Sequence, residues 1–336
     1  MRYNTLGIHL TNACPLTCDH CITDSSPRSR GDLSWEQIEG AVRSAATYVD
    51  GVCVTGGEPM LRPDLALATI RLTHDLGLRS SMVTSGYWAR TPAKAAAVVA
   101  ELVAAGLDKL AVSFDQFHLT QKTARFVGAG TLHHLLEAAA PTRMELVVQY
   151  CGTGGDEAHG IAESAAVRYG ARLETAEVLP FGRGAALARR RDADMADVPT
   201  GPCGVVGRPI LTPEVDFYTC CGPARGATVH SPLRLSIDSA AQAGSALAAA
   251  SVDPIINSIH TRGPRALFDR LSSEARQRVS RNLRDSSMCS LCRAITDDEE
   301  AVSELRGELD REALRLVALS GVLHVAQDEE VARCHR

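Results

Sequence analysis

Up to about residue 180, short apolar runs alternate with longer amphipathic runs. Apolar runs rich in β-branched residues predict strands, and apolar positions three and four apart predict helices. The expected strands are 6–10, 52–54, 79–83, 109–114, 144–150 and 172–179. The expected helices are 34–48, 65–76, 93–105, 121–139 and 158–169. Six strands separated by helices predict an α/β fold with a parallel sheet, either a curved partial barrel or a doubly wound sheet.

The best-marked helix start is at Ser34. Ser34 with Gln37 three residues later is the pattern of a capping box, so we expect the first helix to begin there. In either parallel fold, ligands bind at the carboxyl ends of the strands, where the loops to the helices gather. Residues just after the expected strands are therefore the candidates for chemistry.

The pattern changes after residue 180. Gly, Pro and Cys cluster between 201 and 226, and residues 215–219 lead into a cysteine pair as one arm of an expected β-hairpin. Two Ala-rich stretches have no clear period. The segment from 297 to about 318 is acidic with helical apolar spacing, and we expect an amphipathic closing helix there.

Composition narrows the class of protein. The 336 residues are 45% hydrophobic and 22% charged, with a formal net charge of 35 − 40 = −5. This balance favours a globular chain without a nucleic-acid partner. With no signal-peptide pattern and no run of 18 apolar residues, we expect a cytoplasmic protein with no membrane partner. Its eleven cysteines then indicate metal ligands rather than disulfides.

Three cysteines follow the first expected strand in the run NACPLTCDHC: Cys14, Cys18 and Cys21. A structural zinc site needs four ligands, and this loop supplies three. Three thiolates suit one face of a [4Fe–4S] cluster and leave the fourth iron open. An open iron can bind a small chelate with an amine and a carboxylate, such as the methionyl end of S-adenosylmethionine. A zinc knuckle or a pair of redox thiols is the alternative.

The C-x3-C-x2-C spacing of Cys14, Cys18 and Cys21 resembles the motif of the radical S-adenosylmethionine (radical SAM) enzymes. His20 stands where that family usually has an aromatic residue that lies against the adenine. Gly56-Gly57-Glu58-Pro59, after the second strand, resembles the family's loop for the cofactor ammonium, in which Glu58 would hold the positive charge. The resemblance implies a partial (βα)6 barrel that binds S-adenosylmethionine and a [4Fe–4S] cluster.

The resemblance also implies cofactor contacts at further strand ends. In relatives, polar side chains at these places reach the carboxylate and the ribose of the cofactor. The matching positions in this chain are Ser85, Ser113, Asp115, Gln149 and Arg183. Capping of the loops by these side chains is the alternative at each position.

A second set of cysteines lies beyond the barrel: Cys203, the pair Cys220-Cys221, and Cys289 with Cys292. It resembles the twitch extension, a reduced form of the SPASM extension, which holds an auxiliary [4Fe–4S] cluster. The expected ligands are Cys203, Cys220, Cys289 and Cys292, with zinc as the alternative metal. The expected domains are the barrel at 1–190, the auxiliary extension at 191–296 and a helical tail at 297–336.

The cysteine pair leaves one thiol over. If Cys220 binds the cluster, Cys221 points elsewhere on an extended backbone and could return a hydrogen atom to a carbon radical. This combination resembles the radical peptide epimerases of ribosomal natural-product pathways, as do the runs 18–21, 113–118 and 287–292. Cys221 is thus the candidate catalytic residue, and an exchange of roles with Cys220 stays open.

The leading hypothesis is a radical enzyme that epimerises residues of a ribosomally made precursor peptide. It would need an electron donor of the flavodoxin or ferredoxin type. A second hypothesis keeps the radical chemistry but gives another outcome, such as cross-linking or oxidation, or a small sugar, nucleoside or amino-acid substrate. A third is a non-catalytic iron–sulfur or zinc protein that senses redox state.

Overall fold

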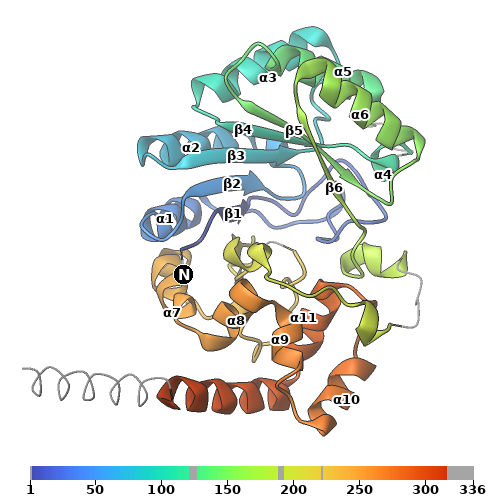
Figure 1. Cartoon of the computed structure of the whole chain (residues 1–336). Coiled ribbons are helices and arrows are strands. Elements are labelled where there is room, and N and C mark those ends of the chain that lie inside the picture. Colours follow the sequence, from blue (N-terminus) through green and yellow to red (C-terminus); the bar gives the residue numbers. More distant parts are fainter. Residues whose placement is uncertain (1, 121–126, 188–192, 221, 316–336) are drawn as a thin grey trace, which may run out of the picture.

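The computed structural model describes residues 2–120, 127–187, 193–220 and 222–315. One nine-stranded sheet runs through it in the order β6-β5-β4-β3-β2-β1-β7-β8-β9. The first six strands are all parallel and lie side by side in chain order (Figure 1). They are β1 (Leu6–His9), β2 (Gly51–Thr55), β3 (Arg79–Thr84), β4 (Lys109–Ser113), β5 (Glu145–Cys151) and β6 (Arg172–Ala176). The predicted α/β fold with six parallel strands is confirmed.

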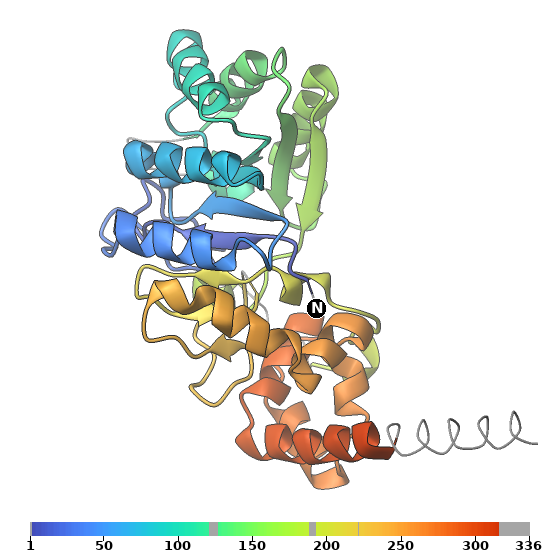
Figure 2. The same cartoon turned by 90° about the vertical axis from the view of Figure 1, so that its left-hand side faces the viewer.

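A layer of helices covers the outer face of these strands (Figures 1 and 2), and each helix packs against the next. They are α1 (Trp35–Ala45), α2 (Pro63–Asp75), α3 (Pro92–Ala104), α5 (Ala129–Ala139) and α6 (Glu157–Tyr169). The predicted capping box is present, because Ser34 accepts from the backbone of Gln37 and the Gln37 side chain accepts from the backbone of Ser34.

The helix expected at 121–139 differs from the structure. Asp115 caps a short helix, α4 (Gln116–Leu119), and α5 begins only at Ala129. Residues 121–126 lie outside the described part of the chain. The short α4 matters because it fixes Asp115 and His118 at the carboxyl end of β4.

The extension continues the sheet beyond β1. Strand β7 (Ile210–Leu211) pairs parallel to β1, and β8 (Phe217–Tyr218) and β9 (Arg234–Leu235) follow antiparallel. The expected hairpin therefore forms, and it does so on the edge of the barrel sheet. The proposed boundary at residue 190 lies outside the described residues, and the division into three domains stays a prediction.

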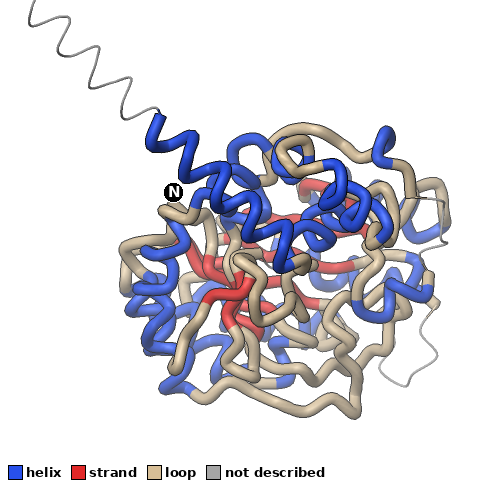
Figure 3. The backbone as a smooth tube through the Cα atoms, turned by 90° about the horizontal axis from the view of Figure 1, so that it is seen from below, coloured by secondary structure: helices blue, strands red, loops and turns tan. Residues whose placement is uncertain are grey.

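Helices complete the extension below β1 (Figures 1 and 2). Helix α1 packs against α7, and Tyr3 donates from its hydroxyl to the carbonyl oxygen of Leu247 at 3.2 Å. A last helix over residues 299–315 runs along the underside (Figure 3). The other helices are α7 (Ala243–Ser251), α8 (Pro254–Arg262), α9 (Pro264–Phe268), α10 (Ser273–Arg281) and α11 (Met288–Thr296).

Among the described helices, none has the length and apolar content needed to cross a membrane.

Candidate active site

The loop between β1 and α1 carries the first three cysteines. Cys14 and Cys18 are buried, and Cys21 is half-buried. Burial raises the pKa of the Cys14 thiol, and the negative charges of Glu58, Cys18 and Cys21 raise it further. The three thiols are therefore close enough to feel one another's charge. Such mutual repulsion is relieved when thiolates share a metal centre.

The backbone of this cysteine loop is held by Arg183. Its Nε donates to the carbonyl oxygen of Cys18 at 2.9 Å, and its terminal nitrogen donates to Ser25 at 2.8 Å. Its backbone nitrogen donates to the carbonyl oxygen of Cys21 at 3.0 Å. Arg183 thus ties the end of the barrel to the loop, and contact with a cofactor stays a prediction for this residue.

The Gly56-Gly57-Glu58 loop lies directly against the cysteine loop. The backbone nitrogen of Gly57 donates to Thr11 at 2.6 Å, and that of Glu58 donates to Ala13 at 2.9 Å. A Cβ atom at Gly57 would lie only 2.3 Å from the Ala13 carbonyl oxygen. Glycine is needed at this position because two backbones approach too closely for any side chain.

The Glu58 carboxylate is completely buried and has four donors around it. One oxygen accepts from the backbone of Met60 at 3.0 Å and from the Thr84 hydroxyl at 2.8 Å. The other accepts from the backbone and the hydroxyl of Ser85, at 2.8 and 2.6 Å. Burial raises the pKa of Glu58, and these hydrogen bonds oppose the rise. Glu58 and Ser85, both predicted to bind the cofactor, bind each other and join the ends of β2 and β3.

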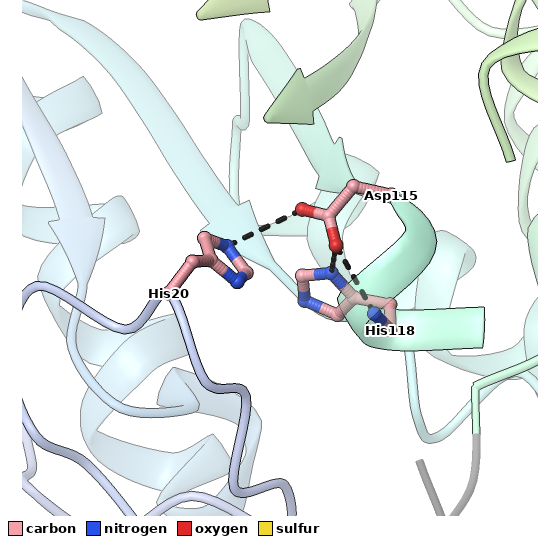
Figure 4. A group of neighbouring side chains, drawn as sticks. All are labelled: His20, Asp115 and His118. Atoms are coloured by element: carbon pink, nitrogen blue, oxygen red, sulfur yellow. Dashed lines mark hydrogen bonds and ion pairs between the residues drawn. The ribbon is translucent and has the colours of Figure 1, made fainter. Parts of the chain in front are cut away.

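His20, in the cysteine loop, meets Asp115 and His118, which follow β4 (Figure 4). One Asp115 oxygen lies 2.8 Å from Nδ1 of His118, and the other lies 3.3 Å from Nε2 of His20. The His20 ring stacks on Phe117 with 4.5 Å between ring centroids. Two loops that are far apart in sequence are thus joined by one carboxylate.

The charges of this trio follow from burial and pairing. Burial lowers the pKa of His118, but the Asp115 carboxylate and its hydrogen bond outweigh burial and raise that pKa well above the usual value. Burial raises the pKa of Asp115, but the charge and hydrogen bonds of His118 outweigh it and lower that pKa. Burial lowers the pKa of His20. The resulting state is a buried His118–Asp115 ion pair beside a neutral His20 ring.

These residues fit the cofactors that the sequence predicts. Three neighbouring thiols match one face of a [4Fe–4S] cluster. Nδ1 of His20 is buried and has no hydrogen-bond partner among the described residues, which leaves a polar atom for a ligand. Ser113 and Gln149 are half-buried neighbours at the ends of β4 and β5, on the same edge of the sheet. Their contact with a cofactor stays a prediction.

The second set of thiols also gathers in space. Cys203 precedes the 3-10 helix Gly204–Gly207, Cys220 follows β8, and Cys289 and Cys292 lie in α11. Burial raises the pKa of Cys292 well above its usual value, and the charges of Cys220, Cys203 and Cys289 add to the rise. Cys221, the candidate hydrogen donor, lies outside the described residues.

Two contributors were not assigned a role from the sequence. His118 lay in the quoted 113–118 run, and its signal was an aspartate three residues before a histidine directly after a strand. Arg225, in the extension, donates to Nδ1 of His9 at 2.6 Å. Nothing local marks that contact, because the two residues are 216 positions apart.

Comparison with known proteins supports the same assignment. Residues 8–140 match the Radical SAM superfamily model. The chain is 33% identical over 124 residues to a "Probable GTP 3',8-cyclase" of Methanothermobacter thermautotrophicus (37% of this chain, 38% of that protein). It is 31% identical over 190 residues to the mycofactocin maturase MftC of Mycobacterium ulcerans (52% and 47%). It is 34% identical over 109 residues to the PqqA peptide cyclase of Methylobacterium nodulans (31% and 27%).

The chain thus spans half or less of the length of each of these relatives. The matched segment begins within β1 and contains β2 to β4, the three-cysteine loop, the Gly-Gly-Glu loop and the His20–Asp115–His118 trio. Residues 8–140 therefore form a segment that matches the radical SAM superfamily.

Proposed function

We propose that this protein reductively cleaves S-adenosylmethionine and abstracts a hydrogen atom from a peptide Cα. The observation that carries the proposal is the placement of Cys14, Cys18 and Cys21 together on one loop, directly against the Gly56-Gly57-Glu58 loop, within the segment that matches the radical SAM superfamily. When bound, the cluster and S-adenosylmethionine supply the electron transfer and the 5'-deoxyadenosyl radical.

The chain's own residues have distinct tasks in this proposal. The three thiolates hold the cluster, and Arg183 and Gly57 keep their loop in one conformation. His20, held in place by Phe117 and Asp115, would lie against the adenine. Glu58 acts through Ser85 and Thr84 by fixing the strand ends, in addition to any attraction of its charge for the cofactor ammonium.

An auxiliary [4Fe–4S] cluster held by Cys203, Cys220, Cys289 and Cys292 is part of the proposal. The charges of Cys220, Cys203 and Cys289 raise the pKa of Cys292, so these thiols are near neighbours, as the ligands of one cluster would be. Zinc is the alternative metal for the same four thiols.

The peptide substrate is favoured by the relatives. One is named a peptide cyclase. Another, a "Probable GTP 3',8-cyclase", keeps a nucleotide substrate as the second candidate. We place peptide first because a second set of cysteines accompanies the radical domain, in the arrangement that resembles peptide-modifying enzymes.

The proposed outcome is inversion of a peptide Cα. S-adenosylmethionine, when bound, would supply the radical that removes the Cα hydrogen. The thiol of Cys221 gives a hydrogen atom to the opposite face of the planar carbon radical, which leaves a thiyl radical. One electron from a flavodoxin- or ferredoxin-type donor and one proton then restore the thiol. The alternatives with the same first step are a peptide cross-link, an oxidation or a change to a small metabolite.

Incubation with a candidate peptide in deuterated water tests this outcome, because a thiol exchanges its hydrogen with the solvent. Epimerisation predicts a gain of about one mass unit per modified residue, whereas cross-linking or oxidation predicts a loss of about two. Absence of any cofactor cleavage in the cluster-loaded protein would instead favour a redox sensor.

The two neighbouring cysteines can be separated by substitution. Cys220→Ala should lose auxiliary iron, because a cluster deprived of one thiolate is easily lost. Cys221→Ala should keep its iron and still cleave the cofactor, but form no inverted product. The opposite pattern exchanges the two roles. If neither change alters the product, no thiol donor acts and the epimerase assignment is wrong.

A further inference from the structure

A cavity of about 240 Å³ lies between the two sets of thiols. Its wall includes Ile22 directly after Cys21, Gly222 two residues after Cys220, and Arg293 directly after Cys292. Three of the lining side chains are arginines, and Asp24 is the one carboxylate among the lining residues described. The cavity is therefore a positively charged space beside both metal-binding regions.

Arg225 is half-buried and lacks a close counter-charge. One of its terminal nitrogens is bonded to the His9 ring, which burial and the Arg225 charge keep neutral by lowering its pKa to about 3. Glu214 and Asp24 are within electrostatic reach. Among the described residues, however, no carboxylate lies within 4.0 Å of the guanidinium. Partial removal of a guanidinium from water is unfavourable unless an anion compensates for it, so Arg225 favours binding of an anion in this cavity.

Arg284, which is exposed, lines the same cavity from the segment before α11. Its guanidinium lies over the Phe181 ring at 5.0 Å from the centroid and donates to the carbonyl oxygen of Pro180 at 3.1 Å. It too has no carboxylate within 4.0 Å in the described part of the chain. Stacking on the ring fixes the guanidinium plane and leaves its other N–H groups for a planar or tetrahedral oxyanion.

Arg293 differs from Arg225 and Arg284 because its charge is neutralised by a carboxylate. It pairs with Asp297 at 2.6 Å and donates to carbonyl oxygens of residues 223, 225 and 226. These hydrogen bonds fix the backbone of residues 223–226, in the loop after Cys220. The unneutralised charge of the cavity comes from Arg225 and Arg284.

We propose that this cavity binds an oxyanion group of the substrate through Arg225 and Arg284. The group is a carboxylate of an acidic peptide or a phosphate of a nucleotide, since both present two or more oxygens to a guanidinium fork. Its place between the two thiol sets would hold the charged end of a substrate whose reacting carbon faces the first loop. That the oxyanion belongs to a substrate rests on the proposed function, but the existence of the oxyanion site does not.

Calorimetric titration of cluster-loaded protein at low ionic strength with glutarate and, separately, with pyrophosphate tests the site. We expect saturable binding of at least one probe. Arg284→Gln should weaken it about tenfold, the effect of removing a charge-assisted hydrogen-bonding group, and Arg284→Lys should weaken it less. Arg43→Gln, at an exposed arginine paired with Glu39, should bind as the wild type does.

The pattern of binding identifies the source of the oxyanion. Preference for glutarate assigns a carboxylate, and preference for pyrophosphate assigns a phosphate. If neither probe saturates, or if Arg284→Gln binds like the wild type, the oxyanion site is wrong. Substrate-free cleavage of S-adenosylmethionine should be the same in Arg43→Gln as in the wild type. Binding without any cleavage in the wild type would reject the radical function and keep the site.

Discussion

Arg225 of the extension donates a hydrogen bond to His9 at the end of β1, with 2.6 Å between its terminal nitrogen and Nδ1. His9 is 1% exposed, and burial and then the Arg225 charge lower its pKa from 6.5 to about 3. A neutral ring is what the arginine needs as an acceptor. The joint between barrel and extension therefore depends on an uncharged histidine.

Lowering the pH should weaken the contact between Arg225 and His9 and so lower the free energy of unfolding. The unfolded chain binds a proton on His9 below about pH 6.5, whereas the folded chain resists it until about pH 3, so the contribution to stability is present above 6.5 and is lost as the pH falls. Between pH 7.5 and 5.5 the loss is about 1.4 kcal/mol. Urea unfolding at both pH values should show a smaller acid loss in His9→Gln than in the wild type. Equal losses would mean that His9 titrates normally.

The approach of Gly57 to Ala13 predicts a specific cost for one methyl group. Gly57→Ala would place Cβ 2.3 Å from a backbone oxygen, so the cysteine loop must shift. We expect iron at the first site to fall by half or more after reconstitution, a loss of about 2 kcal/mol or greater in loop stability. Gly130→Ala is the control, because nothing lies within 4 Å of a Cβ there. Normal iron in Gly57→Ala would show that the loops are not so tightly apposed.

Glu58→Gln separates a structural role from a cofactor role. The amide would turn an N–H group toward donors from Met60 and Thr84 or from Ser85, which leaves buried donors unpaired at a cost of about 2–3 kcal/mol. The melting temperature should therefore fall even without S-adenosylmethionine, and Glu39→Gln, at the exposed pair with Arg43, should change it little. If the variant has a normal melting temperature and differs only in binding the cofactor more weakly, Glu58 binds the cofactor ammonium, as predicted from the sequence.

Asp115→Asn should remove the counter-charge that joins His118 and His20. Breaking a buried pair of this kind costs about 3–5 kcal/mol, and the freed His20 ring should weaken binding of S-adenosylmethionine. Asp156→Asn is a matched control, since Asp156 also caps a helix and accepts from the backbone of a histidine three residues on. Calorimetry on the cluster-loaded variants checks both. Equal cofactor affinity in the two variants would place Asp115 outside the site.

The features that depend on local sequence patterns were predicted from the sequence. Six strands, the Ser34 capping box and the meeting of the Cys14 and Glu58 loops follow from periodicity and from the topology of parallel sheets. The Ala-rich helix α7 was not predicted, because alanine on every face gives no amphipathic contrast.

Long-range contacts could not be predicted from the sequence, because they depend on residues that only the fold brings together. Strand β7 has two residues, and only its pairing with β1 makes it a strand. The full burial of Glu58 also depends on donors 26 and 27 positions away. A glutamate after two glycines looks like a free ligand until those donors are placed around it.

Cys14, Cys18 and Cys21 are proposed to hold the cluster that cleaves S-adenosylmethionine. Two [4Fe–4S] clusters predict about eight irons in the anaerobically reconstituted protein, and replacing all three cysteines by Ala should leave about half. The direct measurement is 5'-deoxyadenosine formed after reduction in the presence of S-adenosylmethionine. We expect the wild type to release 5'-deoxyadenosine and the triple variant to release none above background. Equal 5'-deoxyadenosine from both proteins, or none from a wild type that holds its iron, would show that these three cysteines do not hold such a cluster.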